Sequence, residues 1–510
     1  MSSLSSSQPH PPHPPSSSSS PPSSAIPHIY AELLVHIRTV TFFASLRPTT
    51  TASSTTRAEL SPDGACVTLT HAGERVVVRL PARVQLPSPR QQQQWQRGGS
   101  GGGGARVLYE GPSDKAEGVE VRLRVREEGE GGGGGGGGGE NAVPWDAGEL
   151  EGGCGRVGCR ECLGEVVGVV VRKADDEAED GGGAAISRRQ DGDSGGGVER
   201  WMDLPNENWA EMMDFWHCHK PHEHHLPGHT HDGRDDVGKE KGYAASNRIM
   251  AKKGVGYVDL TYLLLAEEDC SGVQPSTSTT SSSNTATERR QLICSSCKSI
   301  VGVTDPRADG WRIWKWSVAI APKGETTTTS ARSYNIRKWI AAQLLYLIEN
   351  QAVRKFTITV DSDDIFQRGE GEEGSETGSG GPVRAATRDP IMIWVFTPDL
   401  SFSSSIASSA SATADDAGRH YDNPTRAMKV LWKPAAAQNG DVTQSSAVAA
   451  AGQALDRQSL STEELSLPPP AFDALKEGLH ESGAWLPASA RTFREWNVGL
   501  LERFAEDEVR

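Results

Sequence analysis

The sequence predicts a mainly β protein of the α+β class, because extended patterns outnumber helical ones. Several segments are rich in β-branched and aromatic residues and alternate partly in period two, which is typical of strands. A Pro-Asp-Gly sequence at 62–64 predicts a tight turn before one of them. The segments predicted as strands are 29–46, 66–71, 75–80, 119–125, 310–320, 355–360, 391–396 and 427–432.

Helical patterns are few and lie in the second half of the chain. The best covers 335–351, where four apolar residues fall near one face and the other side is polar: Trp339, Leu344, Leu345 and Ile348. A second helix is predicted at 472–482. The closing segment 492–504 fits either a helix or a strand. We therefore expect a β-rich core with a few packing helices.

Low-complexity tracts interrupt these segments and explain the unusual composition, in which only 36% of the 510 residues are hydrophobic and 56 are Gly. Such tracts cannot bury enough apolar surface to offset chain entropy. We expect a disordered tail at 1–26 and one domain at 27–510, with a division into two lobes, 27–322 and 333–510, as an alternative. The expected disordered loop insertions are at about 88–105, 127–142, 173–200, 271–288, 367–388, 402–418 and 434–463.

The tracts are better interpreted as insertions than as linkers between independent domains. The segments between them are mostly too short to fold alone, and loop closure becomes only slowly more costly with length. Without the tracts roughly 325 residues remain, which suits one large domain or two closely packed ones.

Charge and composition exclude several classes of protein. No run of 18 apolar residues occurs, so no membrane-spanning helix is expected. The N-terminus lacks the apolar segment of a secretory signal. A formal net charge of −15 argues against direct binding of nucleic acid. Eight cysteines are too few for a disulfide framework, so we expect a reducing compartment, the cytoplasm or the nucleus or both.

Two CxxC pairs predict a metal site. They are Cys159–Cys162 and Cys294–Cys297, and each is followed by small and β-branched residues ending in Gly. Two residues between thiolates let a tight turn present both sulfurs to one Zn²⁺, and two such turns complete a tetrahedron. The sequence therefore predicts a structural zinc ion held by these four cysteines. Two unrelated pairs of free thiols are the alternative.

The densest functional pattern is the segment 204–221, LPNENWAEMMDFWHCHKP, in which His217 and His219 flank Cys218. A thiol between imidazoles has the ingredients of a reactive thiolate, because a nearby His can take its proton or act as its counter-ion. A covalent catalytic role for Cys218 competes with two alternatives. Cys218 could be a small buried residue, or it could bind a metal together with the histidines that follow.

With 254–265, 292–302 and 489–504, this segment resembles the HECT-like ubiquitin ligases that bind a ubiquitin-conjugating enzyme (E2). The segment 29–40 and Pro144–Trp145 fit the same family. The resemblance implies a ubiquitin-protein ligase, an E3 transferase. Its partners would be a ubiquitin-conjugating enzyme, ubiquitin and a protein substrate. It also implies that Cys218 is the position to test for a thioester with ubiquitin, with His217 or His219 assisting proton transfer.

One departure from the related HECT ligases bears on mechanism. Those enzymes keep their reactive cysteine in a C-terminal lobe, whereas no cysteine follows Cys297 here. The catalytic lobe is therefore not the same, and Cys218 is the best remaining candidate thiol. The competing hypothesis is a non-catalytic, zinc-stabilised adaptor or chaperone-like binding protein.

Overall fold

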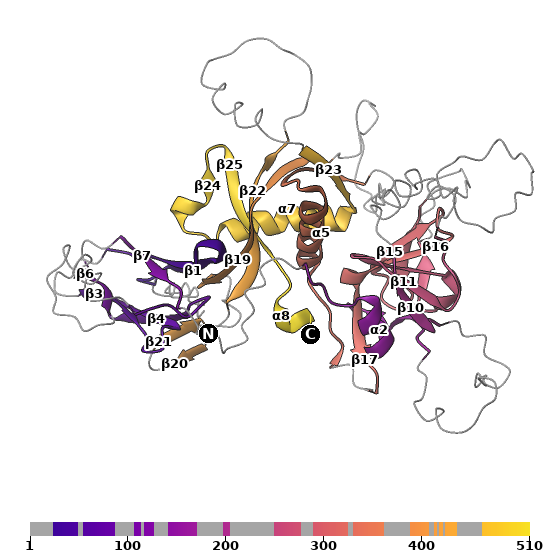
Figure 1. Ribbon diagram of the computed structural model, residues 1–510, viewed down its shortest axis with the longest axis horizontal. Helices are drawn as coiled ribbons and strands as arrows, with labels where there is room; N and C mark the ends of the chain where they lie inside the picture. Colours follow the sequence, from indigo (N-terminus) through magenta and orange to yellow (C-terminus); the bar gives the residue numbers. More distant parts are fainter. Residues whose placement is uncertain are drawn as a thin grey trace, which may run out of the picture. The chain divides into compact units, whose positions relative to one another are not determined.

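The computed structural model describes fourteen segments of the chain and arranges them in two compact units (Figure 1). Unit 1 lies within 1–32, 38–127 and 403–423, and unit 2 within 33–37, 128–402 and 424–510. The described residues are 24–48, 55–86, 107–113, 117–126, 141–170, 197–204, 249–276, 289–324, 330–361, 388–406, 413–415, 418–421, 424–435 and 462–509.

Unit 1 is built of short strands: β1 (His28–Leu34), β2 (Thr39–Ser45), β3 (Thr55–Leu60), β4 (Cys66–His71), β5 (Glu74–Arg79), β6 (Val107–Pro112), β7 (Gly118–Arg124), β20 (Thr413–Asp415) and β21 (Gly418–Tyr421). β3, β4 and β5 form an antiparallel meander, with β6 beside β3 and a parallel β21 beside β5. β2 pairs antiparallel with β7. Burial alternates along β4 and β7, as expected for strands with one face on a core.

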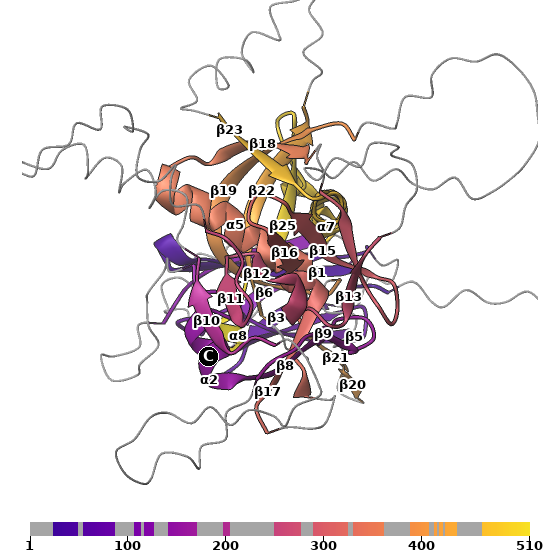
Figure 2. The same ribbon diagram turned by 90° about the vertical axis from the view of Figure 1, so that its right-hand side faces the viewer.

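One sheet of unit 2 consists of long and short strands: β18 (Lys355–Val360), β19 (Ile391–Ser404), β22 (Thr425–Pro434), β23 (Thr462–Leu467), β24 (Thr492–Phe493) and β25 (Trp496–Glu502). β19, β22 and β25 pair antiparallel in that order, and β18 joins β19 to a parallel β23. Helices α5 (Ile336–Gln351) and α7 (Pro469–Gly483) cover one face of this sheet (Figures 1 and 2).

The rest of unit 2 consists of two smaller sheets and several short helices. The label η stands for a 3-10 helix. The elements are α2 (Ala147–Gly153), β8 (Cys154–Cys159), β9 (Glu165–Val167), β10 (Arg200–Asp203), β11 (Val255–Val258), β12 (Tyr262–Leu265), η4 (Glu267–Asp269), β13 (Val273–Pro275), β14 (Gln291–Cys294), β15 (Ile300–Asp305), β16 (Gly310–Trp314), η5 (Lys315–Ser317), β17 (Val318–Pro322), η8 (Ala488–Ala490) and α8 (Glu506–Val509), while η1 (Val35–Ile37) follows β1. One sheet has the order β10-β11-β12-β16-β15-β14-β13, and the other is β17-β8-β9.

The prediction of a mainly β protein with a few packing helices is confirmed, and most predicted strands agree with the structure to within a few residues. Two predicted strands are interrupted. The segment 29–46 contains β1, η1 and β2, and 310–320 contains β16, η5 and the start of β17. Arg38 after η1 has a positive φ of 49°, so the chain turns where the residue pattern alone suggested continuous extension. The closing segment forms strands, not a helix.

The best predicted helix is confirmed as α5, which begins after Asn335. The Asn335 side chain accepts a hydrogen bond from the N–H of Arg337 and caps the first turn. Ala352 in the left-handed region ends the helix. Trp339, Leu344 and Leu345 are buried in the main core of unit 2, which also includes residues of α7 and β19. In the described part of the chain, no helix has the length and apolarity needed to cross a membrane.

Several sequence-based predictions fall partly or wholly outside the described residues. The tail at 1–26 lies outside them up to residue 23. Most of each predicted insertion also lies outside them, except that slightly more than half of 402–418 is described. Parts of some insertions are described and contain regular structure. β20 and β21 lie within 402–418 or directly after it, and β13 lies within 271–288. The disorder of the remaining tracts stays a prediction.

Candidate metal centre

The first CxxC pair sits in a tight turn at the end of β8. The N–H of Cys159 donates to the carbonyl of Gly164 at 2.7 Å, and the N–H of Leu163 donates back to Cys159 at 2.8 Å. Leu163 has a positive φ of 58°, which lets the chain reverse directly after Cys162. β8 itself is held between β17 and β9, so the turn projects from a paired strand.

The second pair repeats this geometry at the end of β14. Cys294 donates to Ser299 at 2.8 Å, Lys298 donates back to Cys294 at 3.0 Å, and Lys298 has a φ of 64°. Each turn therefore has the same two backbone hydrogen bonds and the same left-handed residue after its second cysteine. Two matching turns of this kind are the expected halves of a four-thiolate site.

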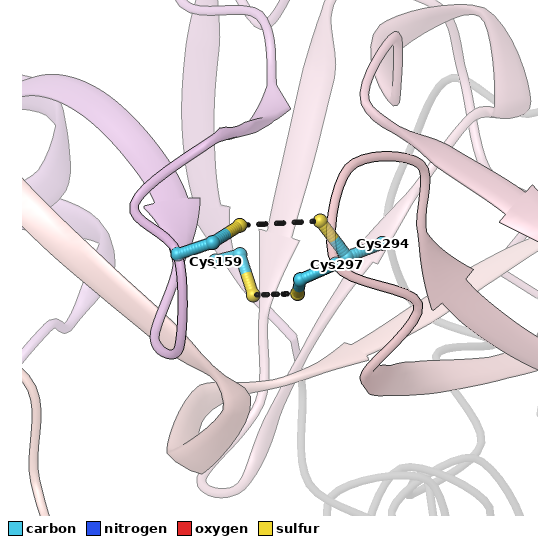
Figure 3. Close-up of side chains that lie close together, drawn as sticks. Cys159, Cys294 and Cys297 are labelled. Atoms are coloured by element: carbon cyan, nitrogen blue, oxygen red, sulfur yellow. Dashed lines mark hydrogen bonds between the residues drawn. The ribbon is translucent and has the colours of Figure 1, made fainter.

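The two turns bring four sulfurs together (Figure 3). Cys159 Sγ lies 3.6 Å from Cys297 Sγ, and Cys162 Sγ lies 3.7 Å from Cys294 Sγ. All four sulfurs lie within 4.8 Å of one another. A zinc–sulfur bond of about 2.3 Å in a regular tetrahedron places the sulfurs about 3.8 Å apart, so the observed pairs fit such an ion. The four cysteines could hold a metal ion, as the sequence pattern predicts.

Burial differs within each turn in the same way. The first cysteine of each pair, Cys159 and Cys294, is buried, and the second, Cys162 and Cys297, is exposed. An ion at the centre would therefore rest on the protein interior with one side near solvent. This is the arrangement of an ion that joins two loops at the surface of a fold.

Two glycines allow close approach of the chain around the centre, Gly164 between the two turns and Gly272 against β9. A Cβ on Gly164 would lie 3.0 Å from the Ser296 hydroxyl of the other turn, so a larger side chain would push the turns apart. A Cβ on Gly272 would lie only 1.6 Å from the carbonyl oxygen of Glu165 in β9. The Gly272 carbonyl in turn accepts the N–H of Ser295, which links β9 to the second turn.

The electrostatics of the four thiols favour a cation between them. The Ser299 hydroxyl lies 2.5 Å from Cys297 Sγ, and this hydrogen bond together with the Ser299 N–H lowers the pKa of Cys297 to about 6. The Gly164 N–H lowers the pKa of Cys162, but desolvation and bonds to the other three thiols outweigh it and raise that pKa to about 12. Four neighbouring thiolates become stable together only when a bound cation compensates their charge.

Two of the three described cysteines outside the centre, Cys154 and Cys270, are poor nucleophiles. Cys154 is 1% exposed, and desolvation raises its pKa to about 12. Cys270 is 3% exposed, and desolvation, followed by the nearby Asp269 carboxylate, raises its pKa strongly. Cys66 is half-buried in β4. The predicted catalytic residues Cys218, His217 and His219 lie outside the described residues, so their role stays a prediction.

A second notable cluster in unit 2 surrounds a buried lysine that the sequence analysis did not identify. Lys315 in η5 is 1% exposed, and its ammonium donates to the Trp145 carbonyl at 3.0 Å. The same nitrogen lies 5.3 Å from the centre of the Trp339 ring. Tyr334 and Phe504 complete the surrounding aromatic group, with ring centres 4.8 to 6.3 Å apart.

The environment of Lys315 is consistent with a structural role. Desolvation lowers its pKa to about 8, although the carboxylates of Asp259 and Asp203 oppose this shift. The cluster joins the Pro144–Trp145 segment to α5 and to the end of the closing segment. Arg160, inside the first cysteine turn, donates to the carbonyls of Trp316 and Tyr334, so the cluster and the metal centre are connected.

Some of these residues carried signals that the sequence analysis did not use. The positions of Ser299 and Gly164 are equivalent, two residues after the last cysteine of each pair. The repeat of the two turns could therefore have indicated both. No comparable signal marks Lys315 or Gly272, because their importance comes from segments that are distant in sequence.

Comparison with known proteins places the chain in a family. A profile of the family described as HECT-like ubiquitin-conjugating enzyme (E2)-binding matches residues 32–498. An uncharacterized protein of Saccharomyces cerevisiae, YJR141W, is 20% identical over 297 residues, which cover 58% of this chain and 61% of that protein. An uncharacterized protein of Schizosaccharomyces pombe, C1734.10c, is 22% identical over 316 residues, or 61% of this chain and 70% of that protein.

No solved structure matches the chain. The family match nevertheless extends over both CxxC turns, α5, α7 and the start of β25, so it includes nearly every described element. The chain therefore belongs to the family of HECT-like ubiquitin-conjugating enzyme (E2)-binding proteins.

Proposed function

We propose that this protein binds a ubiquitin-conjugating enzyme and promotes transfer of ubiquitin to lysines of a protein substrate, as an E3 ubiquitin-protein ligase. The observation that carries the proposal is the family match over residues 32–498. Both relatives are themselves uncharacterized, so they add nothing about activity. We further propose that the protein acts in the cytoplasm, the nucleus or both, where free thiols and thiolate-bound metals persist.

The metal in our proposal is a structural zinc ion bound by Cys159, Cys162, Cys294 and Cys297. Four thiolates in a near-tetrahedral arrangement are typical of closed zinc sites, which keep no open position for a substrate. The ion would hold the turn after β8 against the turn after β14. Its role in ubiquitin transfer would then be to stabilise the surface that binds the conjugating enzyme.

A covalent mechanism would use Cys218. Its thiolate would attack the thioester carbonyl of the charged conjugating enzyme, forming a new thioester and releasing the enzyme's thiolate. A substrate lysine amine would then attack this thioester and release Cys218 as the thiolate. His217 or His219 would accept the proton that the amine loses.

The alternative to a ligase is the non-catalytic adaptor, and one observation is in its favour. Of the seven described cysteines, four form the candidate metal centre and two are deeply buried with raised pKa values. The adaptor hypothesis needs no reactive thiol and is compatible with this distribution. It predicts binding to the conjugating enzyme without any ubiquitin adduct on the chain.

The deciding experiment incubates the full chain with activating enzyme, charged conjugating enzyme and ubiquitin. The covalent version predicts a reductant-sensitive adduct of one ubiquitin that disappears in Cys218→Ser and persists in Cys66→Ser, the matched control. If chains form equally well with Cys218→Ser, the ligase is non-covalent. If the conjugating enzyme binds but no ubiquitin chains are stimulated, the adaptor hypothesis replaces the ligase. Failure to bind any charged conjugating enzyme would remove both.

A further inference from the structure

One face of β7 in unit 1 carries a row of arginines (Figure 1). Arg122 and Arg124 belong to β7 and Arg126 follows it, and all three side chains are exposed. The residues between them are buried or half-buried. Because successive side chains of a strand point to opposite faces, these three arginines project from the same face. β2 pairs with β7 along its whole length, so a paired strand supports the row.

A fourth arginine reaches the same face from another segment. Val84 and Val125 form an antiparallel bridge, which places Arg83 opposite Arg126. The Arg126 N–H donates to the Arg83 carbonyl at 2.9 Å. Opposite residues of an antiparallel pair point to the same side, so the exposed Arg83 side chain joins the row. We call the following four residues the arginine face: Arg83, Arg122, Arg124 and Arg126.

The arginine face has fewer carboxylates than guanidinium groups. Arg122 forms a salt bridge of 3.3 Å with Glu120, in which both side chains are largely exposed. Arg83 interacts electrostatically with the exposed carboxylate of Asp63. In the described part of the chain, the other two arginine side chains of the face have no hydrogen-bond or ion-pair partner. The face therefore has an excess of positive charge, on a chain whose formal net charge is −15.

The chemistry of the face suits carboxylates. A guanidinium group binds a carboxylate or a phosphate through two parallel hydrogen bonds. Proteins that bind single-stranded nucleic acid usually add exposed aromatic rings on which bases stack. The large apolar residues exposed in the described part of unit 1 are Leu86 and Ile406, and neither carries a ring. The strongly acidic chain as a whole also opposes a long polyanion.

The spacing of the face suits an extended segment. Residues two apart on a strand lie about 6.8 Å apart. An extended peptide has the same interval along one of its sides, so carboxylates at every second position meet Arg122, Arg124 and Arg126 in turn. Residues on one side of a helix are three or four apart, with a rise of about 4.5–6 Å, and lose this match after the first pair.

We propose that the arginine face binds an extended acidic segment of a partner protein, with a carboxylate at every second position. Each carboxylate accepts hydrogen bonds from one guanidinium group along the row, and Arg83 widens the row beside Arg126. Exposed ion pairs are individually weak, so binding requires several pairs together and is reversible. The inference concerns unit 1 alone and does not depend on the proposed transfer of ubiquitin.

The test measures fluorescence anisotropy of labelled peptides with the full-length protein. The probe is the alternating peptide Glu-Thr-Glu-Thr-Glu-Thr-Glu-Thr. One control has the same composition in blocks, Glu-Glu-Glu-Glu-Thr-Thr-Thr-Thr, and a second control replaces each Glu of the probe with Lys. We expect the probe to bind at least about tenfold more tightly than the lysine peptide and about threefold more tightly than the block peptide. High salt should weaken probe binding, because the pairs are exposed.

Variants of the face connect this binding to particular residues. Arg124→Glu should weaken probe binding at least about tenfold, since it removes one pair and adds a like charge. Arg75→Glu is the matched control: it reverses an exposed arginine of β5, in the other sheet of unit 1, and should bind the probe normally. The double variant Arg122→Glu/Arg124→Glu should prefer the lysine peptide, a gain that cannot result from unfolding. Circular dichroism verifies the fold of each variant.

The following results would overturn the proposal. Equal affinity for the probe and the lysine peptide, or an unchanged affinity of Arg124→Glu, would remove the acidic occupant. Equal affinity for the probe and the block peptide would remove the extended arrangement. Oligothymidylate that binds more tightly than the probe, and is lost in Arg124→Glu, would make the occupant a nucleic acid. Three glutamates follow the face in sequence, outside the described residues. If the probe binds only to Glu127→Gln/Glu128→Gln/Glu130→Gln, the occupant is this acidic tract and not a partner protein.

Discussion

The four-cysteine centre and the Lys315 cluster both join segments of unit 2 that are distant in the chain, but they do so with opposite charges. In the cysteine centre, four thiols meet near the surface, and their anionic form requires a bound cation. In the Lys315 cluster, a cation is already supplied by the chain and is enclosed by Trp145, Trp339 and nearby rings. Arg160 connects the two regions through its bonds to the Trp316 and Tyr334 carbonyls.

The two regions should therefore depend on different solution conditions. The cysteine centre should respond to metal supply, chelators and oxidation, because its stabilising ion comes from outside. The Lys315 cluster should respond to alkaline pH, since its charge comes from a lysine whose pKa is lowered by burial. Each variant below changes one region and leaves the other as the internal reference.

The largest expected effect is loss of the metal in Cys294→Ala. Cys294 is fully buried and supplies one of four sulfurs, so its removal leaves an incomplete site. Zinc sites of this kind contribute roughly 10–16 kcal/mol of apparent binding free energy in small peptides. We expect zinc content to fall from about one per chain to near zero and unfolding free energy to fall by several kcal/mol. Elemental analysis and chemical denaturation measure both.

The matched control for this variant is Cys154→Ala. Cys154 is equally buried, in the same strand as Cys159, but it lies outside the metal centre. Its truncation should cost only about 1 kcal/mol of packing and leave the zinc content unchanged. A wild-type chain that is fully folded and free of metal would contradict the prediction.

The next effect concerns Lys315→Met across the alkaline range. The pKa of Lys315 is about 8 in the folded protein, against 10.5 for an ordinary lysine, so between these values the unfolded chain binds more protons. The free energy of unfolding therefore rises with pH between these values. Above about pH 10.5 the cost of burying the charged lysine is fully relieved. The shift corresponds to about 3 kcal/mol. Methionine abolishes the titration while keeping an unbranched side chain.

The measurement is the unfolding free energy of both proteins at pH 7 and pH 10.5. Other groups titrate in this range, but they are common to both chains and cancel in the difference. Wild type should gain about 3 kcal/mol relative to Lys315→Met as the pH rises. If the difference in unfolding free energy between the two proteins is the same at both pH values, burial does not lower the pKa of Lys315 in the folded state.

The two regions were not equally predictable from sequence. The four cysteines were identified because the CxxC spacing itself encodes a metal-binding turn, and both turns repeat it. Strands such as β4 and β18 were predicted closely because alternating burial leaves a local pattern. Lys315 was missed because it lies inside 310–320, where the residue pattern resembles one continuous strand, and its partners Trp145 and Trp339 are distant in sequence.

The same reasoning explains two exposed aromatic residues. Phe396 lies in a predicted strand and Phe493 in a segment that fits a helix or a strand, and neither pattern tells which apolar side chains face solvent. In the structure Phe396 continues the outward alternation of Trp394 in β19, and Phe493 lies in the short hairpin of β24 and β25. Register is decided by pairing across the whole sheet, which a single segment does not reveal.

The smallest expected effect concerns a hydrogen bond inside the metal centre. Ser299→Ala removes the hydroxyl that lies 2.5 Å from Cys297 Sγ, so the pKa of Cys297 should rise toward its ordinary value. Protons then compete better for this ligand, and zinc affinity at pH 7 should fall about 10- to 100-fold. Ser295→Ala, in the same turn, is the matched control and should bind zinc like the wild type. Competition with a chromophoric chelator measures both variants. Equal affinities would mean that the Ser299 hydroxyl does not tune the ligand, and that the backbone turn alone prepares Cys297 for the metal.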